Sequence, residues 1–348
     1  MHKRLVHNNF DLLRLLLSVI VCLAHAYELS GFMQLQWLTA YFTSGYAVKA
    51  FFVVSGFLVF MSYERSISVA SYLEKRARRI FPAYFTVIVL LAFLLVLVSN
   101  TSGSHYFLSG EWARYLLSNL AFLNFLQPTL PGVFETNPIH AVNGALWTLK
   151  IEVMFYCCVP LLVYLCRKFK PLWVLLAVYF LSQAYHVVVA RYNAELAMQL
   201  PGQMCYFVAG ALLYYYLTFF ERHVAKFVAA AILALVLKAS LLTPMAIGIL
   251  VIFAALYFYL GNFSKYGDFS YGFYILHYPI IQLYVASGVF DGKPWIFLLT
   301  VVGTTTVASV ALWHLVEKRF LTKSSHYTRA TVEGKAAPEA VALPGSTS

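Results

Sequence analysis

Long apolar segments recur along the chain and are separated by polar loops. Segments of about 17–22 apolar residues, rising 1.5 Å per residue, are long enough to cross the ~30 Å hydrocarbon core of a membrane as α-helices. Segment 112–126 is shorter and lies between long polar loops, so we predict an interfacial or re-entrant helix there. The pattern predicts about ten spans, near residues 10–29, 38–61, 81–99, 144–165, 172–190, 203–220, 226–242, 245–261, 269–288 and 295–315.

The composition supports an all-α, polytopic integral membrane protein. Hydrophobic residues make up 61% of the chain and charged residues only 11%, which no ordinary soluble domain of this length shows. We therefore predict one transmembrane domain over residues 1–321, and we expect the polar segment 322–348, rich in Pro, Gly and Ser, to be a disordered cytoplasmic tail.

The positively charged residues indicate which loops face the cytoplasm. In a soluble protein the net charge of +11 would suggest a nucleic-acid partner, but cytoplasmic loops of membrane proteins carry such an excess, so we expect membrane lipids and no nucleic acid as partners. With ten spans and a segment 112–126 that does not cross, the basic loops, among them 62–80, all lie on one side. Both termini are then predicted to be cytoplasmic.

Arg14 and His25 are among the ionisable residues of the first predicted span. They are separated by eleven residues, which corresponds to about three helical turns and roughly 16 Å, so both side chains lie on one face of the helix. Because an unpaired ionisable group in hydrocarbon is costly, such residues indicate a functional site.

A basic cluster precedes the third span. Lys75, Arg76, Arg78 and Arg79 lie within five residues, and we expect the helix to begin where Pro82 follows them. One interpretation is a topology anchor that contacts anionic lipids. The other is a clamp for the phosphates of a cytoplasmic donor such as coenzyme A, because arginine binds phosphate in a bidentate manner.

The fourth span contains a carboxylate, Glu152, about 12 Å below its predicted outer end, and His25 lies roughly 8 Å below the same surface. The two side chains could therefore meet and form a general-base dyad. The alternative is a structural ion pair of Glu152 with Lys150 or Arg114.

Two further segments are interpreted as packing features. Ser55 and Gly56 in the second span favour close approach of another helix. Tyr274 and His277 are one turn apart at the start of the ninth span, where Pro279 would kink the helix. We favour a core histidine at position 277 over a contact with substrate.

The remaining features are structural or absent. Glu317, after the last span, is interpreted as a partner of Arg319 or of the cations at 76–79. The sequence has no Walker A loop, no H-E-x-x-H, no Cys/His metal spacing and no dinucleotide glycine motif, so we expect no metal. The five cysteines are read as apolar filler rather than as acyl carriers.

Taken together, these segments resemble the membrane-bound acyltransferase family 3, the bacterial O-acyltransferases of cell-surface sugars. The resemblance covers roughly residues 8–320. It rests on Arg14 and His25, FFVVSGFL at 51–58, YLEKRARRIFPAYF at 72–85, ALWTLKIEVMFY at 145–156, SYGFYILHYP at 270–279 and Glu317.

The resemblance implies ten transmembrane helices in the cell inner membrane and acetyl-coenzyme A as the cytoplasmic donor. By position, Arg14, Arg76 and Arg79 match residues that engage the donor, His25 matches the essential histidine, and Glu152 matches an acidic residue of the family. Many relatives carry an appended esterase-like domain, whereas we expect this chain to be of the stand-alone type.

The resulting hypothesis is an O-acetyltransferase that moves an acetyl group from acetyl-coenzyme A to a hydroxyl of a cell-surface or lipid-linked sugar or polysaccharide. His25, oriented by Glu152, would act as a base or as a transient acyl carrier. The candidate substrate contacts are Trp147, Tyr274 and His277, the last as the alternative to a core histidine. The alternative from another class is a transporter or flippase of a lipid-linked sugar, which would also have polar groups at mid-membrane.

Overall fold

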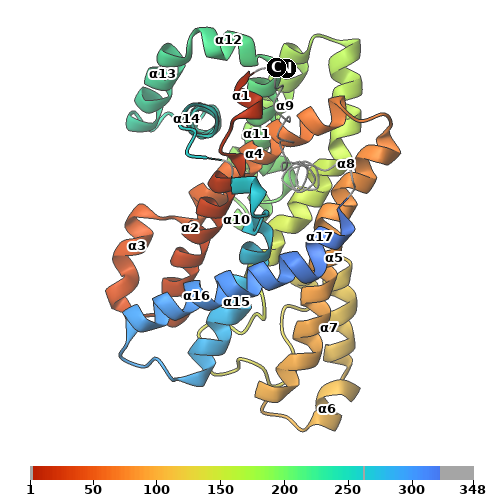
Figure 1. Cartoon of the computed structure of the whole chain (residues 1–348), viewed down its shortest axis with the longest axis vertical. Coiled ribbons are helices and arrows are strands. Elements are labelled where there is room, and N and C mark those ends of the chain that lie inside the picture. Colours follow the sequence, from red (N-terminus) through yellow and green to blue (C-terminus); the bar gives the residue numbers. More distant parts are fainter. Residues whose placement is uncertain (1–2, 262, 322–348) are drawn as a thin grey trace, which may run out of the picture.

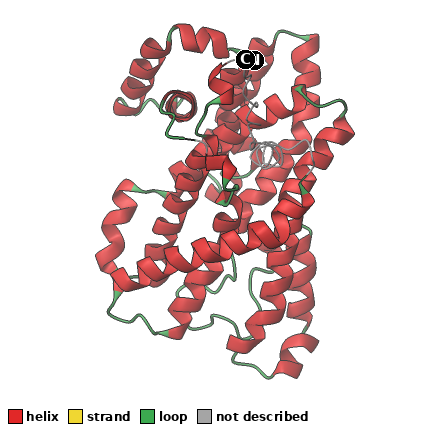
Figure 2. Cartoon of the chain, in the orientation of Figure 1, coloured by secondary structure: helices red, strands yellow, loops and turns green. Residues whose placement is uncertain are grey.

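The computed structural model describes residues 3–261 and 263–321, and these residues form helices joined by loops, without a strand among them (Figure 2). The predicted all-α class is therefore confirmed, while the predicted tail, 322–348, lies outside the described residues. The longer helices are α2 (Phe10–Ser30), α4 (Ser44–Glu64), α5 (Val69–Leu94), α8 (Trp147–Lys168), α9 (Pro171–Val189), α11 (Leu200–Tyr215), α15 (Ser270–Ser287) and α16 (Pro294–Leu312) (Figure 1). The shorter ones are α1 (Lys3–Val6), α3 (Gln36–Tyr41), α6 (Gly103–Leu108), α7 (Gly110–Leu120), α10 (Ala194–Ala197), α12 (Leu217–Arg222), α13 (Val224–Val236), α14 (Thr243–Tyr257) and α17 (Lys318–Phe320).

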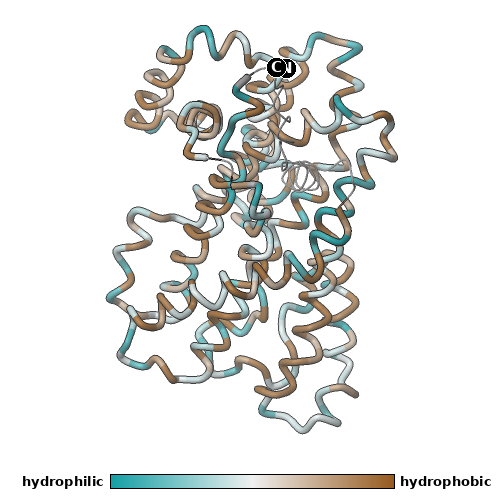
Figure 3. The backbone as a smooth tube through the Cα atoms, in the orientation of Figure 1, coloured by the Kyte–Doolittle hydropathy of each residue, from teal (hydrophilic) through white to brown (hydrophobic). Residues whose placement is uncertain are grey.

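The helices have the lengths and composition of a multi-pass membrane protein. Within the described residues, seven helical stretches are long and apolar enough to cross a membrane, and apolar residues continue along most helices while polar ones gather in the loops (Figure 3). Two predicted spans fall on the shorter α13 and α14, and the 13 residues of α13 reach only about 20 Å. The count of ten spans stays a prediction, although each of the ten predicted segments contains a helix.

Helix α7 lies at the end of the molecule opposite α12 and α13 (Figure 1). Its 11 residues reach about 16 Å, too short to cross a membrane. The Ser109 hydroxyl caps it by accepting a hydrogen bond from the Trp112 backbone N–H at 3.1 Å. The length agrees with the interpretation that segment 112–126 does not cross.

The predicted start of the third span is wrong, because α5 begins at Val69 rather than at the proline. Ser68 caps this start by accepting from the Ser71 backbone N–H at 3.1 Å, and the basic residues that follow are good helix formers. Pro82 therefore lies inside the helix, at the cost of one backbone hydrogen bond. As a result Arg76 and Arg79 lie one turn apart on one helical face.

The predicted close approach at Ser55–Gly56 is confirmed. A Cβ at Gly56 would lie 1.9 Å from the Phe207 carbonyl oxygen, and one at Gly210 would lie 2.0 Å from that of Val53. Glycine on both helices thus allows α4 and α11 to cross in backbone contact. Helix α4 also packs against α2 and α8, and α2 packs against α15.

Candidate active site

A cavity of about 660 Å³ lies among α2, α4, α5, α8 and α15. Six of its lining side chains are cationic and two are carboxylates, so the wall carries a net positive charge. The cations are Arg14, Arg65, Lys75, Arg76, Arg78 and Arg79. Such a wall suits a ligand with several negative charges, such as a polyphosphate.

The cavity is polar at one end and largely apolar at the other. Along α4 the lining runs from Ser62, beside the basic cluster, to Val48, which is 14 residues or about 21 Å away. Phe51 and Phe52 line the end near Val48, where Tyr274 of α15 joins them. The arrangement therefore fits an elongated ligand that is anionic at one end and apolar at the other.

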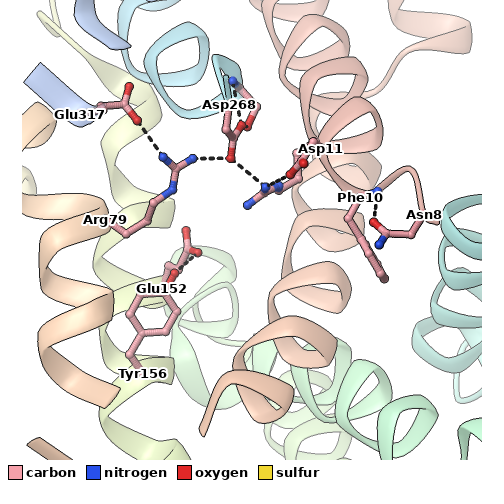
Figure 4. Close-up of polar contacts among 10 residues, drawn as sticks. Asn8, Phe10, Asp11, Arg79, Glu152, Tyr156, Asp268 and Glu317 are labelled. Atoms are coloured by element: carbon pink, nitrogen blue, oxygen red, sulfur yellow. Dashed lines mark hydrogen bonds and ion pairs between the residues drawn. The ribbon is translucent and has the colours of Figure 1, made fainter. Parts of the chain in front are cut away.

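Two of the arginines are held in a buried ion-pair cluster (Figure 4). Asp268, whose side chain is 1% exposed, pairs with Arg79 and with Arg14, the latter at 2.7 Å. Arg79 Nη1 also donates to Glu317 Oε2 at 2.9 Å, and Arg14 pairs with Asp11. The predicted contact of Glu317 with the basic cluster is therefore confirmed, and the charges of both arginines are compensated within the protein.

Arg76 differs from these two arginines. Among the described residues it has no carboxylate partner, and its Nη2 donates to the Ser62 hydroxyl at 3.2 Å while its guanidinium faces the Tyr156 ring at 5.8 Å. Lys75 likewise donates to a hydroxyl, that of Ser66, at 3.2 Å. Arg76 and Lys75 thus carry uncompensated charge toward the cavity.

Asp268, which directly precedes the predicted span 269–288, is not among the residues that the sequence singled out. Charge complementarity could have indicated its role, because Asp268 is an acidic residue on the predicted cytoplasmic side, where the arginines gather. The fold brings it between α2 and α5, and its Oδ1 accepts from the Ser270 backbone N–H at 3.2 Å at the start of α15. The pairing required the tertiary arrangement of three helices.

The predicted dyad of His25 and Glu152 is not formed, and neither is an ion pair of Glu152 with Lys150 or Arg114. Glu152 lines the cavity and accepts from the Tyr156 hydroxyl at 2.5 Å and from the Ser55 hydroxyl at 3.4 Å. His25 and Glu152 were expected to meet because their predicted depths in the membrane are similar. Similar depth is not sufficient, because the helix faces that carry the two side chains must also point toward each other.

His25 instead meets His277. His25 Nδ1 lies 2.8 Å from His277 Nε2, with the ring planes only 7° apart, and the rings of Tyr278 and His25 form a T-shaped contact with 5.2 Å between ring centroids. On the other side, His25 Nε2 lies 3.8 Å from Glu28 Oε2. His25 is thus held on its inner edge by α15 and faces an acidic group one turn along α2.

An aromatic partition separates the cavity from the histidine pair. Tyr274 lines the cavity, bonds the Thr148 hydroxyl at 2.7 Å and contacts the rings of Phe51 and His277 at centroid distances of 5.6 and 5.7 Å. The predicted proximity of Tyr274 and His277 is therefore confirmed. Neither His25 nor His277 is among the residues lining the cavity, and neither is Trp147, which lies half-buried at the start of α8.

The described residues contain no group of three or more His, Cys, Asp and Glu side chains placed to hold a metal ion. The side chains in and beside the cavity that can take part in chemistry include imidazoles, hydroxyls and carboxylates. A pair of imidazoles behind Tyr274 at the apolar end of a cavity, with a basic wall at the other end of that cavity, is suited to transfer of a group from a phosphate-bearing carrier once Tyr274 moves.

The fold defines a polytopic membrane protein made of helices, and comparison with known proteins gives its class. Residues 7–314 match the model of the acyltransferase domain of acyltransferase family 3, so the chain belongs to this family. The protein is an O-acyltransferase embedded in a membrane.

Two relatives are similar over nearly their whole length. The O-acetyl transferase of Shigella phage Sf6 is 31% identical over 337 residues, covering 93% of this chain and 98% of the relative. Nodulation protein 10 of Rhizobium leguminosarum is 29% identical over 345 residues, covering 89% and 92%. The O-acetyltransferase OatA of Staphylococcus aureus is 28% identical over 152 residues, which are 39% of this chain and 22% of OatA. No solved structure gives a significant match.

Proposed function

We propose that this protein transfers an acetyl group from cytoplasmic acetyl-coenzyme A to a hydroxyl of a cell-surface or lipid-linked sugar, as a multi-pass protein of the bacterial inner membrane. The observation that supports this most directly is the cavity itself, with cations at one end and aromatic side chains at the other, next to the His25–His277 pair. Coenzyme A has the same polarity, because its phosphates lie at one end and its thioester at the other.

The phosphates of the donor bind the basic end of the cavity. Arg76, Lys75 and Arg65 provide the principal contacts, because none of them is paired with a carboxylate among the described residues. Arg14 and Arg79 contribute positive potential from within their ion-pair cluster. The uncharged pantetheine arm of coenzyme A then follows α4 toward Phe51. A shift of the Tyr274 side chain admits the thioester to His25.

His25 acts at the thioester in one of two ways. As a base it takes the proton of the acceptor hydroxyl, whose oxygen bonds to the thioester carbonyl carbon while the carbon–sulfur bond breaks and coenzyme A leaves as a thiolate that recovers the proton. As a nucleophile its ring nitrogen first bonds to the thioester carbonyl carbon while the carbon–sulfur bond breaks and coenzyme A leaves as a thiolate. The acceptor hydroxyl oxygen then bonds to the same carbon and displaces the imidazole, and the hydroxyl proton goes to the thiolate. Its side chain is 17% exposed, which suits access of an acceptor.

Support for an acetyl group and a hydroxyl acceptor comes from the relatives. Those of Shigella phage Sf6 and Staphylococcus aureus are named as an O-acetyl transferase and an O-acetyltransferase, so oxygen is the acceptor atom and acetyl the transferred group in them. We extend both to this chain. The sugar acceptor follows from the family resemblance, and surface glycan compared by NMR in cells with and without the gene would identify it.

The test is acetyl transfer by the purified protein supplied with labelled acetyl-coenzyme A. We expect the native protein to release or transfer label, and His25→Ala to lose about 10²-fold or more of this rate while keeping its membrane level. His186→Ala is the matched control, because the His186 side chain bonds the Ala197 carbonyl oxygen of α10 at 3.1 Å and does not line the cavity. No release of label by the native protein would favour the transporter or flippase alternative, and full activity in His25→Ala would exclude this catalytic role.

A further inference from the structure

The protonation of the histidine pair can be assigned from its hydrogen-bond partners. His277 Nδ1 lies 3.3 Å from the Phe273 carbonyl oxygen, which can only accept, so the hydrogen of His277 is on Nδ1. His277 is fully buried without a carboxylate partner among the described residues, so it is neutral and its Nε2 carries a lone pair. Nε2 must then accept, and the hydrogen bond of 2.8 Å is donated by His25 Nδ1.

This assignment determines which atom of His25 is available for chemistry. With the hydrogen on Nδ1, the lone pair of His25 is on Nε2, which points to the half-exposed Glu28 rather than into the bundle. The distance of 3.8 Å between Nε2 and Glu28 Oε2 is too long for a direct hydrogen bond. It leaves space for a hydroxyl oxygen that contacts both atoms.

We propose that His277 is a positioning residue, which holds His25 with its hydrogen on Nδ1 so that Nε2 acts on the acceptor hydroxyl beside Glu28. This inference rests on the proposed function. The acceptor proton moves to Nε2, the hydroxyl oxygen bonds to the thioester carbonyl carbon, and the sulfur of the donor leaves and takes the proton. Glu28 stabilises the imidazolium while it exists.

This arrangement differs from the predicted dyad in the group that orients His25. It consists of the Phe273 carbonyl, His277, His25 and Glu28. The orienting group is a neutral imidazole on α15, and the carboxylate lies on the opposite edge of the ring, where charge develops. The Tyr278 ring also packs against the His25 ring, in a T-shaped contact.

Substitutions at position 277 test the positioning role. His277→Leu removes the acceptor of the Nδ1 hydrogen, and we expect kcat to fall by about 10²-fold with little change in KM for acetyl-coenzyme A. His277→Gln keeps an acceptor oxygen and a donor, and we expect it to recover most of the lost kcat. Native kcat in His277→Leu would overturn the inference, and so would equal loss in well-folded Leu and Gln variants.

A spectroscopic measurement on the native protein is independent of activity and of whether the variants at position 277 fold. In protein labelled with ¹⁵N-histidine, the His25 signals, identified by their absence in His25→Ala, should show a protonated Nδ1 and a bare Nε2. A protonated Nε2 in the native protein would overturn the inference. These results are distinguishable from failure of the proposed function, because full activity in His25→Ala contradicts that function whatever the state of His277.

Discussion

At the scale of single residues, the arginines of the cavity divide by what compensates their charge. Arg79 is held between Asp268 and Glu317, whose side chains are 1% and 2% exposed, whereas Arg76 contacts only a hydroxyl and an aromatic ring among the described residues. A phosphate gains most from a cation that lacks a carboxylate partner. Arg76 and Arg79 are equivalent in the sequence pattern, but their removal should therefore have different effects. Loss of Arg76 should weaken donor binding, and loss of Arg79 should lower stability.

We predict that Arg76→Ala raises KM for acetyl-coenzyme A at least about tenfold with little change in thermal unfolding, because one charge-assisted phosphate contact is lost. Arg79→Met should instead lower the free energy of unfolding by about 3–5 kcal/mol, because the buried Glu317 loses the arginine that it pairs with and, of its two arginines, the buried Asp268 keeps only Arg14. Thermal unfolding and donor kinetics of the purified variants measure both effects.

The control for the arginine variants is Arg167→Ala, which breaks an exposed pair with Glu64 and should cost only about 0–1 kcal/mol. Equal destabilisation by Arg76→Ala and Arg79→Met would contradict the distinction, as would an unchanged KM in Arg76→Ala.

At the scale of elements, α15 aligns the parts of the site along one axis. Asp268 accepts from Ser270 at its start, Tyr274 closes the cavity about one turn further on, and His277 lies one turn beyond. The path from Asp268 to His277 is nine residues, or about 14 Å. One helix thus links the arginine cluster to the proposed catalytic histidine.

The apolar end of the cavity predicts which acyl groups are accepted. Phe51 packs on Tyr274, so Phe51→Ala opens space where the proposed acyl group lies, and we expect a higher rate with butyryl- relative to acetyl-coenzyme A. Leu58→Ala is the matched control, because Leu58 lines the cavity about two turns nearer the basic end. Initial rates with both donors give the ratio, and an unchanged ratio in Phe51→Ala would argue against an acyl site at this position.

At the scale of the whole molecule, the proposed reaction requires the basic end of the cavity to face the cytoplasm. The loop between α4 and α5 lies at that end, and α6 and α7 lie at the opposite end of the molecule from α12 and α13 (Figure 1). The orientation follows from the excess of Lys and Arg in the loops predicted to be cytoplasmic.

Cysteine labelling tests this orientation. In a variant with its five cysteines replaced, Leu108→Cys and Ile67→Cys each place one thiol at a site that is 87% and 99% exposed, respectively. We expect a membrane-impermeant maleimide to label intact spheroplasts at position 108 and to label position 67 only after lysis. The opposite pattern would invert the predicted topology and place the donor site outside the cell.

The sequence by itself determined the class of the protein, since apolar length and loop charge follow from local composition. It also singled out His25, Arg14, Arg76 and Arg79, because ionisable residues are conspicuous in or beside hydrocarbon. It misplaced the start of α5, where a serine cap outweighs the proline signal.

Only the tertiary structure decided which of these side chains meet. Contacts between helices depend on their rotation and crossing, and the sequence determines the spacing within a helix but not the face that it turns to a neighbour. His25 therefore meets His277 rather than Glu152, and Asp268 joins two arginines that are far apart in the chain. The physical reason is that two side chains at equal depth in a helix bundle meet only when the helix faces that carry them also point toward each other.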